Sequence, residues 1–303
     1  MTEEQFVERV RSAGARVFRV GGCVRDHFRG MPAKDVDYVV TGMTEETLCA
    51  LFPRAEKIGK AFPVYHVRVD GVRREVAFAR RERKTGEGYR GFDVVFDPSV
   101  TIEEDLYRRD TRMNAMALEL PSGDLHDPYG GRSDIAAGMI RAVSQHFMDD
   151  PVRALRAARQ AAAFGFRVEE ETIAYMRACA RELQAEPTER LMGELRRALM
   201  TPRPSVFFRV LRTADLLSVT FPELAALDGQ TQPVEFHPEG DALAHTLAMV
   251  DAVAHETQEI KTRFAALVHD LGKGLTPQEM LPHHYGHERT GLDALAAWNR
   301  RMT

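Results

Sequence analysis

Two aspartates and a pair of glycines near the N-terminus have the residue types and spacing that suit phosphate chemistry. Asp35 and Asp37 lie two apart in an apolar run, so we expect both carboxylates on one face of a strand. Such a pair suits Mg²⁺, which takes one or two carboxylates together with substrate phosphates. Upstream, Gly21 and Gly22 let backbone N–H groups approach an anion, and Arg25 can reach the same phosphate. Either motif alone is also common in solvated loops, but the combination is far more specific.

The elements that must position these residues change in character along the chain. Short apolar runs in the first part predict strands at 16–20, 36–40, 64–69 and 75–79, after an amphipathic helix at 4–13. After Pro151 the sequence is rich in Ala, Leu and Arg, which predicts helices at 152–166, 172–183, 190–200 and 206–217. A linker marked by Pro and Gly precedes two more predicted helices, at 241–256 and 259–271. The fold class is therefore α+β, a small mixed sheet followed by an all-helical region.

Length and composition are those of an ordinary globular protein with about two domains at ~150 residues each. The 303 residues are 44% hydrophobic and 28% charged, which excludes a disordered or fibrous chain. No run approaches the ~18 apolar residues of a membrane helix, so we expect no membrane association. Three cysteines without CxxC spacing indicate a reducing compartment, and we expect a cytoplasmic protein.

The charge distribution favours the first half of the chain as the surface for a polyanion. The net charge of −4 combines 26 basic and 25 acidic residues in 1–165 with 15 and 20 in 166–303. Arginine makes up 35 of the 41 basic residues. Its planar fork suits phosphates and base edges, although GC-rich coding bias would give the same excess.

The aspartate motif and four later segments carry a resemblance to a known family. The stretch VGGCVRDHFRGMPAKDVDYVV from Val20 resembles the catalytic head of the class II tRNA nucleotidyltransferases, the CCA-adding enzymes, within the polymerase β-like superfamily. Four more stretches are similar to later family motifs: RRDTRMNAMAL from Arg108, DPYGGRSD from Asp127, DDPVRALRAARQAAAFGF from Asp149 and ERLMGELRRALM from Glu189. The resemblance implies transfer of nucleotides from CTP and ATP to the 3′ end of tRNA, with no DNA partner. Residues 111–113 depart from the family pattern.

The resemblance also implies roles for the acidic residues of the head. Asp35 and Asp37 would be the catalytic residues and would hold Mg²⁺, with one ion activating the tRNA 3′-hydroxyl and another the leaving group. Glu75 on a following strand is the candidate for a third acid. A surface acid between Arg74 and Arg80 is the competing interpretation of Glu75.

Several further residues would contact the incoming nucleotide. Gly22, Arg25 and Arg109 would contact the triphosphate. For Asp110 and Asn114 the resemblance implies ribose contacts or support of the pocket, and capping or turn roles compete with that interpretation.

Base choice would depend on a helix start. Asp150 and Arg153 are three apart, so their side chains point the same way, and Arg156 follows on the same face. A carboxylate accepts from an exocyclic amino group and a guanidinium donates to a ring nitrogen, which would admit cytosine and adenine. Without the resemblance, this spacing would indicate an ordinary salt bridge. The basic, Gly-rich segment 80–91 is expected to be a loop, which in the family is needed for the final A addition.

The C-terminal region contains a second candidate site. The stretches HPEGDALAHT, ALVHDLGKG and HHYGHERTG resemble the HD phosphohydrolase domain fused to gammaproteobacterial CCA-adding enzymes. His245, His269 and Asp270 are the candidate ligands, for Ni²⁺ or another divalent transition metal. Phosphatase, 2′-nucleotidase and 2′,3′-cyclic phosphodiesterase activities would follow. Because the family continues further and HD sites usually use a late aspartate, we expect this domain to be truncated.

These interpretations divide the chain into three parts. They are a nucleotidyltransferase head at 1–140, a helical nucleotide-selecting and tRNA-binding body at 141–228, and an HD domain at 229–303. A poly(A) polymerase shares the head, but it normally lacks an HD domain. A non-catalytic RNA-binding protein is the alternative from another class, and the presence of all four residues Asp35, Asp37, Asp150 and Arg153 argues against it.

Overall fold

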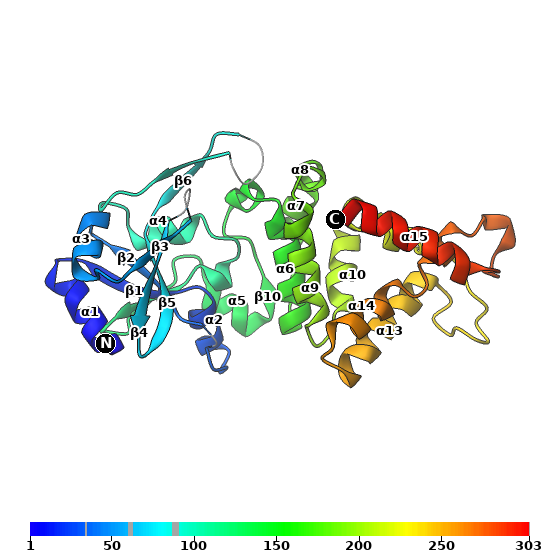
Figure 1. Cartoon of the computed structure of the whole chain (residues 1–303), viewed down its shortest axis with the longest axis horizontal. Coiled ribbons are helices and arrows are strands. Elements are labelled where there is room, and N and C mark those ends of the chain that lie inside the picture. Colours follow the sequence, from blue (N-terminus) through cyan, green and yellow to red (C-terminus); the bar gives the residue numbers. More distant parts are fainter. Residues whose placement is uncertain (34, 60–62, 87–90, 303) are drawn as a thin grey trace. The chain divides into compact units, whose positions relative to one another are not determined.

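The chain forms two compact units in the computed structural model, Met1–Asp149 and Asp150–Thr303 (Figure 1). The structure describes residues 1–33, 35–59, 63–86 and 91–302. Within these residues, no helix combines the length and apolar character needed to cross a bilayer. The first unit contains the sheet and the second is almost entirely helical.

The first unit is built around a seven-stranded mixed sheet with strand order β3-β4-β5-β2-β1-β8-β9. Strands β2 and β5 pair in parallel, and the other neighbours are antiparallel. The strands of the first unit, three of which (β6, β7 and β10) lie outside this sheet, are β1 (Arg16–Val20), β2 (Asp37–Thr41), β3 (Glu56–Ile58), β4 (Val64–Val69), β5 (Val72–Phe78), β6 (Arg81–Lys84), β7 (Phe92–Val95), β8 (Ala117–Leu120), β9 (Leu125–His126) and β10 (Met139–Ile140). Its helices are α1 (Glu3–Ser12), α2 (Gly22–Phe28), α3 (Glu45–Leu51), α4 (Ile102–Tyr107), η1 (Arg112–Asn114), α5 (Gly131–Ala137) and η2 (Gln145–Asp149). The expected mixed sheet is confirmed.

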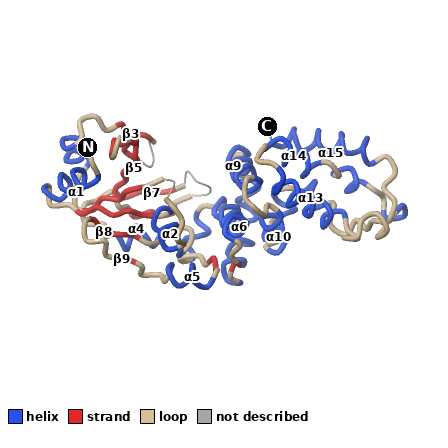
Figure 2. Tube along the Cα trace, turned by 90° about the horizontal axis from the view of Figure 1, so that it is seen from below, coloured by secondary structure: helices blue, strands red, loops and turns tan. Residues whose placement is uncertain are grey.

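Alternation along the central strands gives the sheet two apolar faces. Val17 and Val40 point into a core that contains the buried residues of α1 and α3, whereas Phe18 and Val39 point into a second core with α4. Figure 2 shows α1 and α4 on opposite sides of the sheet. Because side chains alternate, Asp37 lies on the same face as Val39, the face that α4 covers.

Two local expectations for this unit are wrong. Strand β2 begins at Asp37, so Asp35 lies in the segment before it. The partner strand β1 ends at Val20, opposite Asp37, so among the described residues Asp35 lies beyond the paired part of β1 and β2. The expected loop at 80–91 instead begins with strand β6, which pairs with β7 directly after the segment, with Arg81 opposite Val95. Arg81 and Val95, the first paired residues of this hairpin, are both exposed, and the sequence of β6 shows no apolar alternation. Residues 87–90 lie outside the described residues.

The second unit contains the helices expected after Pro151. Two of them are interrupted: 172–183 divides at Cys179, and 259–271 ends in a 3₁₀ turn. A last helix at 287–302 was not among the expectations. The elements are α6 (Val152–Phe164), β11 (Arg167–Val168), α7 (Glu170–Ala178), α8 (Ala180–Gln184), α9 (Thr188–Leu199), α10 (Ser205–Thr213), α11 (Leu217–Thr220), α12 (Pro222–Ala225), α13 (Ala242–Glu256), α14 (Ile260–Val268), η3 (Leu271–Leu275), η4 (Gln278–Met280) and α15 (His287–Met302).

Buried polar contacts explain why these helices form one unit. Arg263 on α14 is 1% exposed and donates to the carbonyls of Leu199 at 2.6 Å and Ala254 at 2.7 Å. These carbonyls lie at or near the ends of α9 and α13, where helical partners are missing. Asp251 on α13 accepts from the backbone N–H and hydroxyl of Ser205 at 2.9 and 2.6 Å, at the start of α10. Helices on both sides of the expected boundary at 228–229 are therefore joined.

Candidate active sites

Three carboxylates line one cavity beside the central strands β2 and β5 of the head sheet. Asp37 is the first residue of β2, and the parallel register places Glu75 of β5 directly beside it. Asp35, Asp37 and Glu75 line the same cavity of about 340 Å³, together with His66. His66 Nε2 lies 3.6 Å from Glu75 Oε1. The structure therefore brings together the expected acid pair and the candidate third acid.

The electrostatics of this cavity fit a divalent cation. Burial raises the pKa of Asp37, and the neighbouring carboxylates of Glu75 and Asp35 raise it further, whereas Arg109 lowers it. Burial and like charge thus disfavour the ionised Asp37 carboxylate, a cost that a bound cation would offset, although Arg73 and Arg74 also line the cavity. Hard oxygen ligands with excess negative charge are what Mg²⁺ prefers. Asp35, Asp37 and Glu75 are therefore the residues that could hold it.

The glycine turn lies next to this acid cluster because Val20, at the end of β1, pairs with Asp37. Gly21 has a φ of 70°, which favours glycine, and a side chain there would place its Cβ 3.3 Å from Arg109 Nη1. At Gly22 the corresponding distance to Arg25 Nη2 is 3.5 Å. Both expected triphosphate arginines thus reach the turn, and the absence of side chains leaves room for them.

A hydrogen-bonded chain connects three more of the expected residues. Arg25 Nη1 donates to Asn114 Oδ1 at 2.8 Å, and Asn114 Nδ2 donates to Asp110 Oδ1 at 3.1 Å. Asp110 is 7% exposed and also accepts from the backbone N–H of Thr111 at 2.7 Å. Asp110 and Asn114 therefore orient Arg25 in this structure, an arrangement compatible with support of a pocket.

The residues expected to select the base lie at the start of the second unit. Asp150 precedes α6, and its carbonyl accepts from the Arg153 backbone N–H at 3.0 Å, so a helical turn spans both residues. Arg153 is 8% exposed and Arg156 is half-buried. The Asp150 carboxylate accepts two hydrogen bonds, at 2.8 and 2.9 Å, from Arg190 of α9. Arg190 was not expected from the sequence, although it lies in a motif that carries the resemblance.

The three expected ligands in the C-terminal region also come together. His245 on α13, His269 after α14 and Asp270 place one ligand atom each within 4.8 Å of one another. His269 Nε2 lies 3.2 Å from Asp270 Oδ2, and His245 Nε2 lies 3.9 Å from the same oxygen. Two imidazoles and a carboxylate suit a divalent transition metal.

The surroundings of Asp270 hold it in its ionised form. Burial would raise the pKa of Asp270, but His269 and Lys273 lower it well below its usual range. Hydrogen bonding to Asp270 raises the pKa of His269. Lys273 is 4% exposed and its Nζ lies 2.7 Å from Asp270 Oδ2. His287 approaches the other oxygen, Oδ1, at 3.6 Å, and His237 packs against His245 with ring centroids 4.7 Å apart.

Sequence reasoning did not assign roles to four of these neighbours: Arg190, Lys273, His287 and His237. Arg190 lies 40 residues from Asp150, whereas Lys273 is only three residues from Asp270. The motifs ERLMGELRR, HDLGKG and GHE contain three of them and were the available signal.

Comparisons with known proteins agree with this architecture. Residues 17–141 match the family described as the poly A polymerase head domain, and residues 165–227 match the probable RNA and SrmB-binding site of polymerase A. Residues 242–302 match the HD domain. The fold and its acid cluster define a nucleotidyltransferase of this head type, joined to an HD domain. Both domain types imply dependence on divalent metal ions.

Similar proteins of known name show which family within this head type the chain belongs to. A multifunctional CCA protein of Pseudomonas fluorescens is 47% identical over 95% of this chain and 70% of its own length. One from Nitrosococcus oceani is 48% identical over 94% of this chain and 70% of its own. This chain belongs to the multifunctional CCA protein family.

Solved structures show the same fold. A CCA-adding enzyme in complex with CTP aligns with a TM-score of 0.66 and 25% identity, over 98% of this chain and 67% of that one. A tRNA nucleotidyltransferase complexed with a primer tRNA and an incoming ATP analog aligns with a TM-score of 0.64 and 25% identity, over 96% and 79%.

Proposed function

We propose that this protein adds and repairs the 3′-terminal CCA of tRNA, using CTP and ATP and no nucleic acid template. The observation that carries the proposal is the acid cluster of Asp35, Asp37 and Glu75 beside Arg109, in a head whose relatives are multifunctional CCA proteins. The related structures bound to CTP, and to primer tRNA with an ATP analog, support these partners. The reaction belongs in the cytoplasm, as the cysteine usage predicts.

In this mechanism the protein positions groups and neutralises charge, because phosphoryl transfer leaves it little covalent chemistry. Asp35 and Asp37, with Glu75 as the third acid, would hold Mg²⁺. Bound Mg²⁺ supplies charge neutralisation for the triphosphate and lowers the pKa of the attacking hydroxyl. Arg25 and Arg109 would donate to the phosphate oxygens from beside the glycine turn.

Base choice in this proposal belongs to Asp150 and Arg153, with Arg156 on the next turn of the same helix. A carboxylate that accepts from an amino group favours cytosine and adenine over uracil and guanine. The two hydrogen bonds from Arg190 fix the direction of the Asp150 carboxylate. Arg190 is therefore a positioning residue for nucleotide choice.

Replacing Arg190 with methionine should lower the selectivity for CTP over UTP about tenfold, because a charge-assisted pair of hydrogen bonds holding Asp150 is lost. Single-nucleotide incorporation with each of the four triphosphates measures this change. Arg197→Met is the matched control, since Arg197 on the same helix pairs with Glu194 and is largely exposed. An equal loss of incorporation for all four nucleotides would show that Arg190 acts only on the fold.

The HD region adds a second proposed activity. His245, His269 and Asp270 would hold Ni²⁺ or another divalent transition metal. Such a site would hydrolyse phosphate esters, as a phosphatase, 2′-nucleotidase or 2′,3′-cyclic phosphodiesterase. Asp270, kept ionised by His269 and Lys273, would provide the negative charge that the cation needs.

The direct test uses purified protein and a tRNA that ends before CCA, with labelled CTP, ATP, UTP or GTP supplied singly and together. We expect two C additions from CTP, one A addition after them from ATP, and no product from UTP or GTP. Growth of a long A tract from ATP alone would instead identify a poly(A) polymerase. Binding of tRNA without any extension would support a non-catalytic RNA-binding protein.

A further inference from the structure

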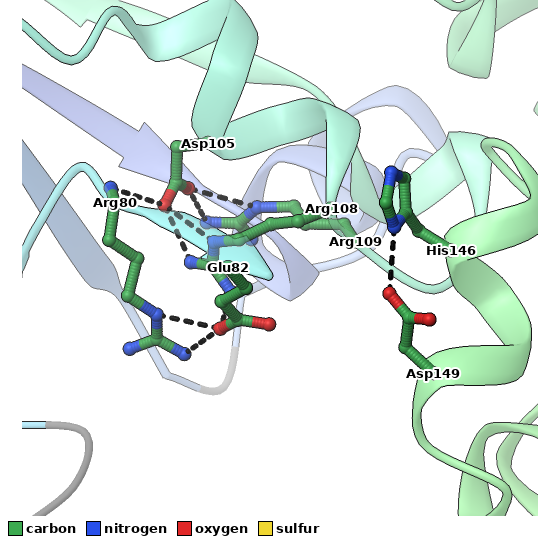
Figure 3. Close-up of polar contacts among 7 residues, drawn as sticks. All are labelled: Arg80, Glu82, Asp105, Arg108, Arg109, His146 and Asp149. Atoms are coloured by element: carbon green, nitrogen blue, oxygen red, sulfur yellow. Dashed lines mark hydrogen bonds and ion pairs between the residues drawn. The ribbon is translucent and has the colours of Figure 1, made fainter. Parts of the chain in front are cut away.

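Five charged side chains form a continuous network at the base of the hairpin β6–β7 (Figure 3). Glu82 of β6 accepts from Arg80 at 2.8 Å and from Arg108 at 2.9 Å. Arg108 Nη2 also donates to Asp105 Oδ1 at 2.5 Å, and Arg109 Nη2 donates to Asp105 Oδ2 at 2.9 Å. The hairpin base is thus linked to Arg109 through two carboxylates and one guanidinium.

Asp105 is the centre of this network. It is fully buried on α4, and each of its oxygens accepts from a different arginine. Burial alone would raise the pKa of Asp105, but Arg108 and Arg109 lower it to about 2. The carboxylate is therefore ionised at neutral pH, and the two guanidinium groups that it binds are held in fixed directions.

Glu82 binds Arg108 through Nη1, the guanidinium nitrogen that does not contact Asp105. Its side chain is only 7% exposed, so its bonds to Arg80 and Arg108 are little weakened by water. Arg108 is consequently bound by carboxylates from both β6 and α4. A change at Glu82 lets Arg108 move, and this movement reaches Arg109 through their shared partner Asp105.

Arg109 is the end of the network that faces the acid cluster. It lowers the pKa of Asp37, and its Nη1 would lie 3.3 Å from a Cβ at Gly21. Its guanidinium also approaches the carbonyl of Asn114 at 3.5 Å. These contacts place its fork between the glycine turn and the catalytic carboxylates.

We propose that Glu82, Arg108 and Asp105 are positioning residues that direct the Arg109 fork toward the triphosphate of the incoming nucleotide. The base of the hairpin is then part of the phosphate-binding apparatus and acts on CTP and ATP alike, since both carry the same triphosphate. The proposal rests on the proposed function, in which Arg109 binds that triphosphate.

The test is Glu82→Gln, which keeps the shape of the side chain and removes its charge. We expect the KM for CTP and for ATP to rise about fivefold each, with kcat within twofold, as for a coupled neighbour of a binding residue. The Kd for inorganic tripolyphosphate, measured by calorimetry with Mg²⁺ present, should rise by the same factor. This binding measurement does not depend on tRNA or on catalysis.

Glu104→Gln is the matched control. Glu104 of α4 also joins the hairpin, through Arg81 at 2.7 Å, but this pair is exposed and does not touch Asp105. Glutamine retains the capping role of Glu104 at the start of α4. The control should leave both KM values and the tripolyphosphate affinity within twofold of the wild type.

A double-mutant cycle with Asp105→Asn tests the connection between the two carboxylates. If Glu82 acts through Asp105, the double variant binds tripolyphosphate no more weakly than Asp105→Asn alone. Additive losses would overturn the proposal. So would unchanged KM values in Glu82→Gln, or an effect on one nucleotide only. If Asp105→Asn does not fold, Arg108→Lys replaces it in the cycle, because lysine keeps the charge and loses the fork.

Failure of the wild type to add CCA would overturn the proposed function, and the tripolyphosphate measurement would still decide this inference.

Discussion

Replacing both Asp35 and Asp37 with asparagine should lower the rate of CTP and ATP incorporation at least about a thousandfold, which is about 4 kcal/mol of transition-state stabilisation. Asparagine keeps the shape of the side chain but supplies no negative charge, so the Mg²⁺ ligands would be lost. Single-turnover incorporation into a tRNA that ends before CCA measures the effect. Raising the Mg²⁺ concentration should restore little of the rate, because both carboxylates are absent.

The same variant should fold as well as the wild type. Burial and the neighbouring acids raise the pKa of Asp37, so its negative charge is less favourable in the folded protein than in the unfolded chain. Removing that charge relieves repulsion with Glu75, and the melting temperature should not fall. Asp124→Asn, at an exposed acid in a turn of the same unit, is the control and should retain full activity. Retention of activity in the double variant would show that other residues hold the metal.

Replacing His269 with alanine should remove the metal from the HD region and lower its phosphohydrolase activity at least about a hundredfold. His269 Nε2 lies 3.2 Å from Asp270 Oδ2 and is one of three ligand atoms within 4.8 Å, so two ligands would remain. Metal content by elemental analysis and hydrolysis of a 2′,3′-cyclic nucleotide measure the two effects. CCA addition should stay within twofold of the wild type, because the expected catalytic acids belong to the other unit.

His255→Ala is the matched control for the HD region. His255 lies on α13, the helix that carries His245, but its side chain is exposed, so metal content and hydrolysis should not change. Full metal content in His269→Ala would contradict the ligand assignment. A parallel loss of CCA addition would contradict the separation of the two activities.

Local sequence patterns determined much of the head. Short apolar runs marked β1 and β4 correctly: β1 buries residues on both faces of the sheet, whereas β4 alternates with the period of two of a strand that buries one face. The same pattern did not mark the hairpin β6–β7, since β6 reads Arg-Glu-Arg-Lys and has no apolar residue to alternate. Asp35 was placed on a strand for a related reason. The apolar run of β2 begins next to Asp35, but the pairing of β2 with β1 ends at Asp37, because the chain of β1 turns at Gly21.

Contacts between distant segments depended on the tertiary structure. From the sequence, Glu75 was a candidate third acid with a surface role as the competing interpretation, and only the parallel register of β2 and β5 placed it beside Asp37. Arg190 reaches Asp150 across 40 residues, and the sequence spacing carries no sign of that contact. Such pairings depend on how whole elements pack, whereas residue spacing constrains only neighbours within one element.

The sequence by itself determined which residue types could do chemistry: the acid pair, the glycine turn, the helix start at Asp150 and the histidines with Asp270. Its motifs were also sufficient to indicate the family, because each motif consists of particular residues at short, fixed spacings. Only the tertiary structure decided which further groups hold those residues in place. Asp105 is the clearest case, because its importance comes from complete burial between two arginines, and burial is a property of the packed fold.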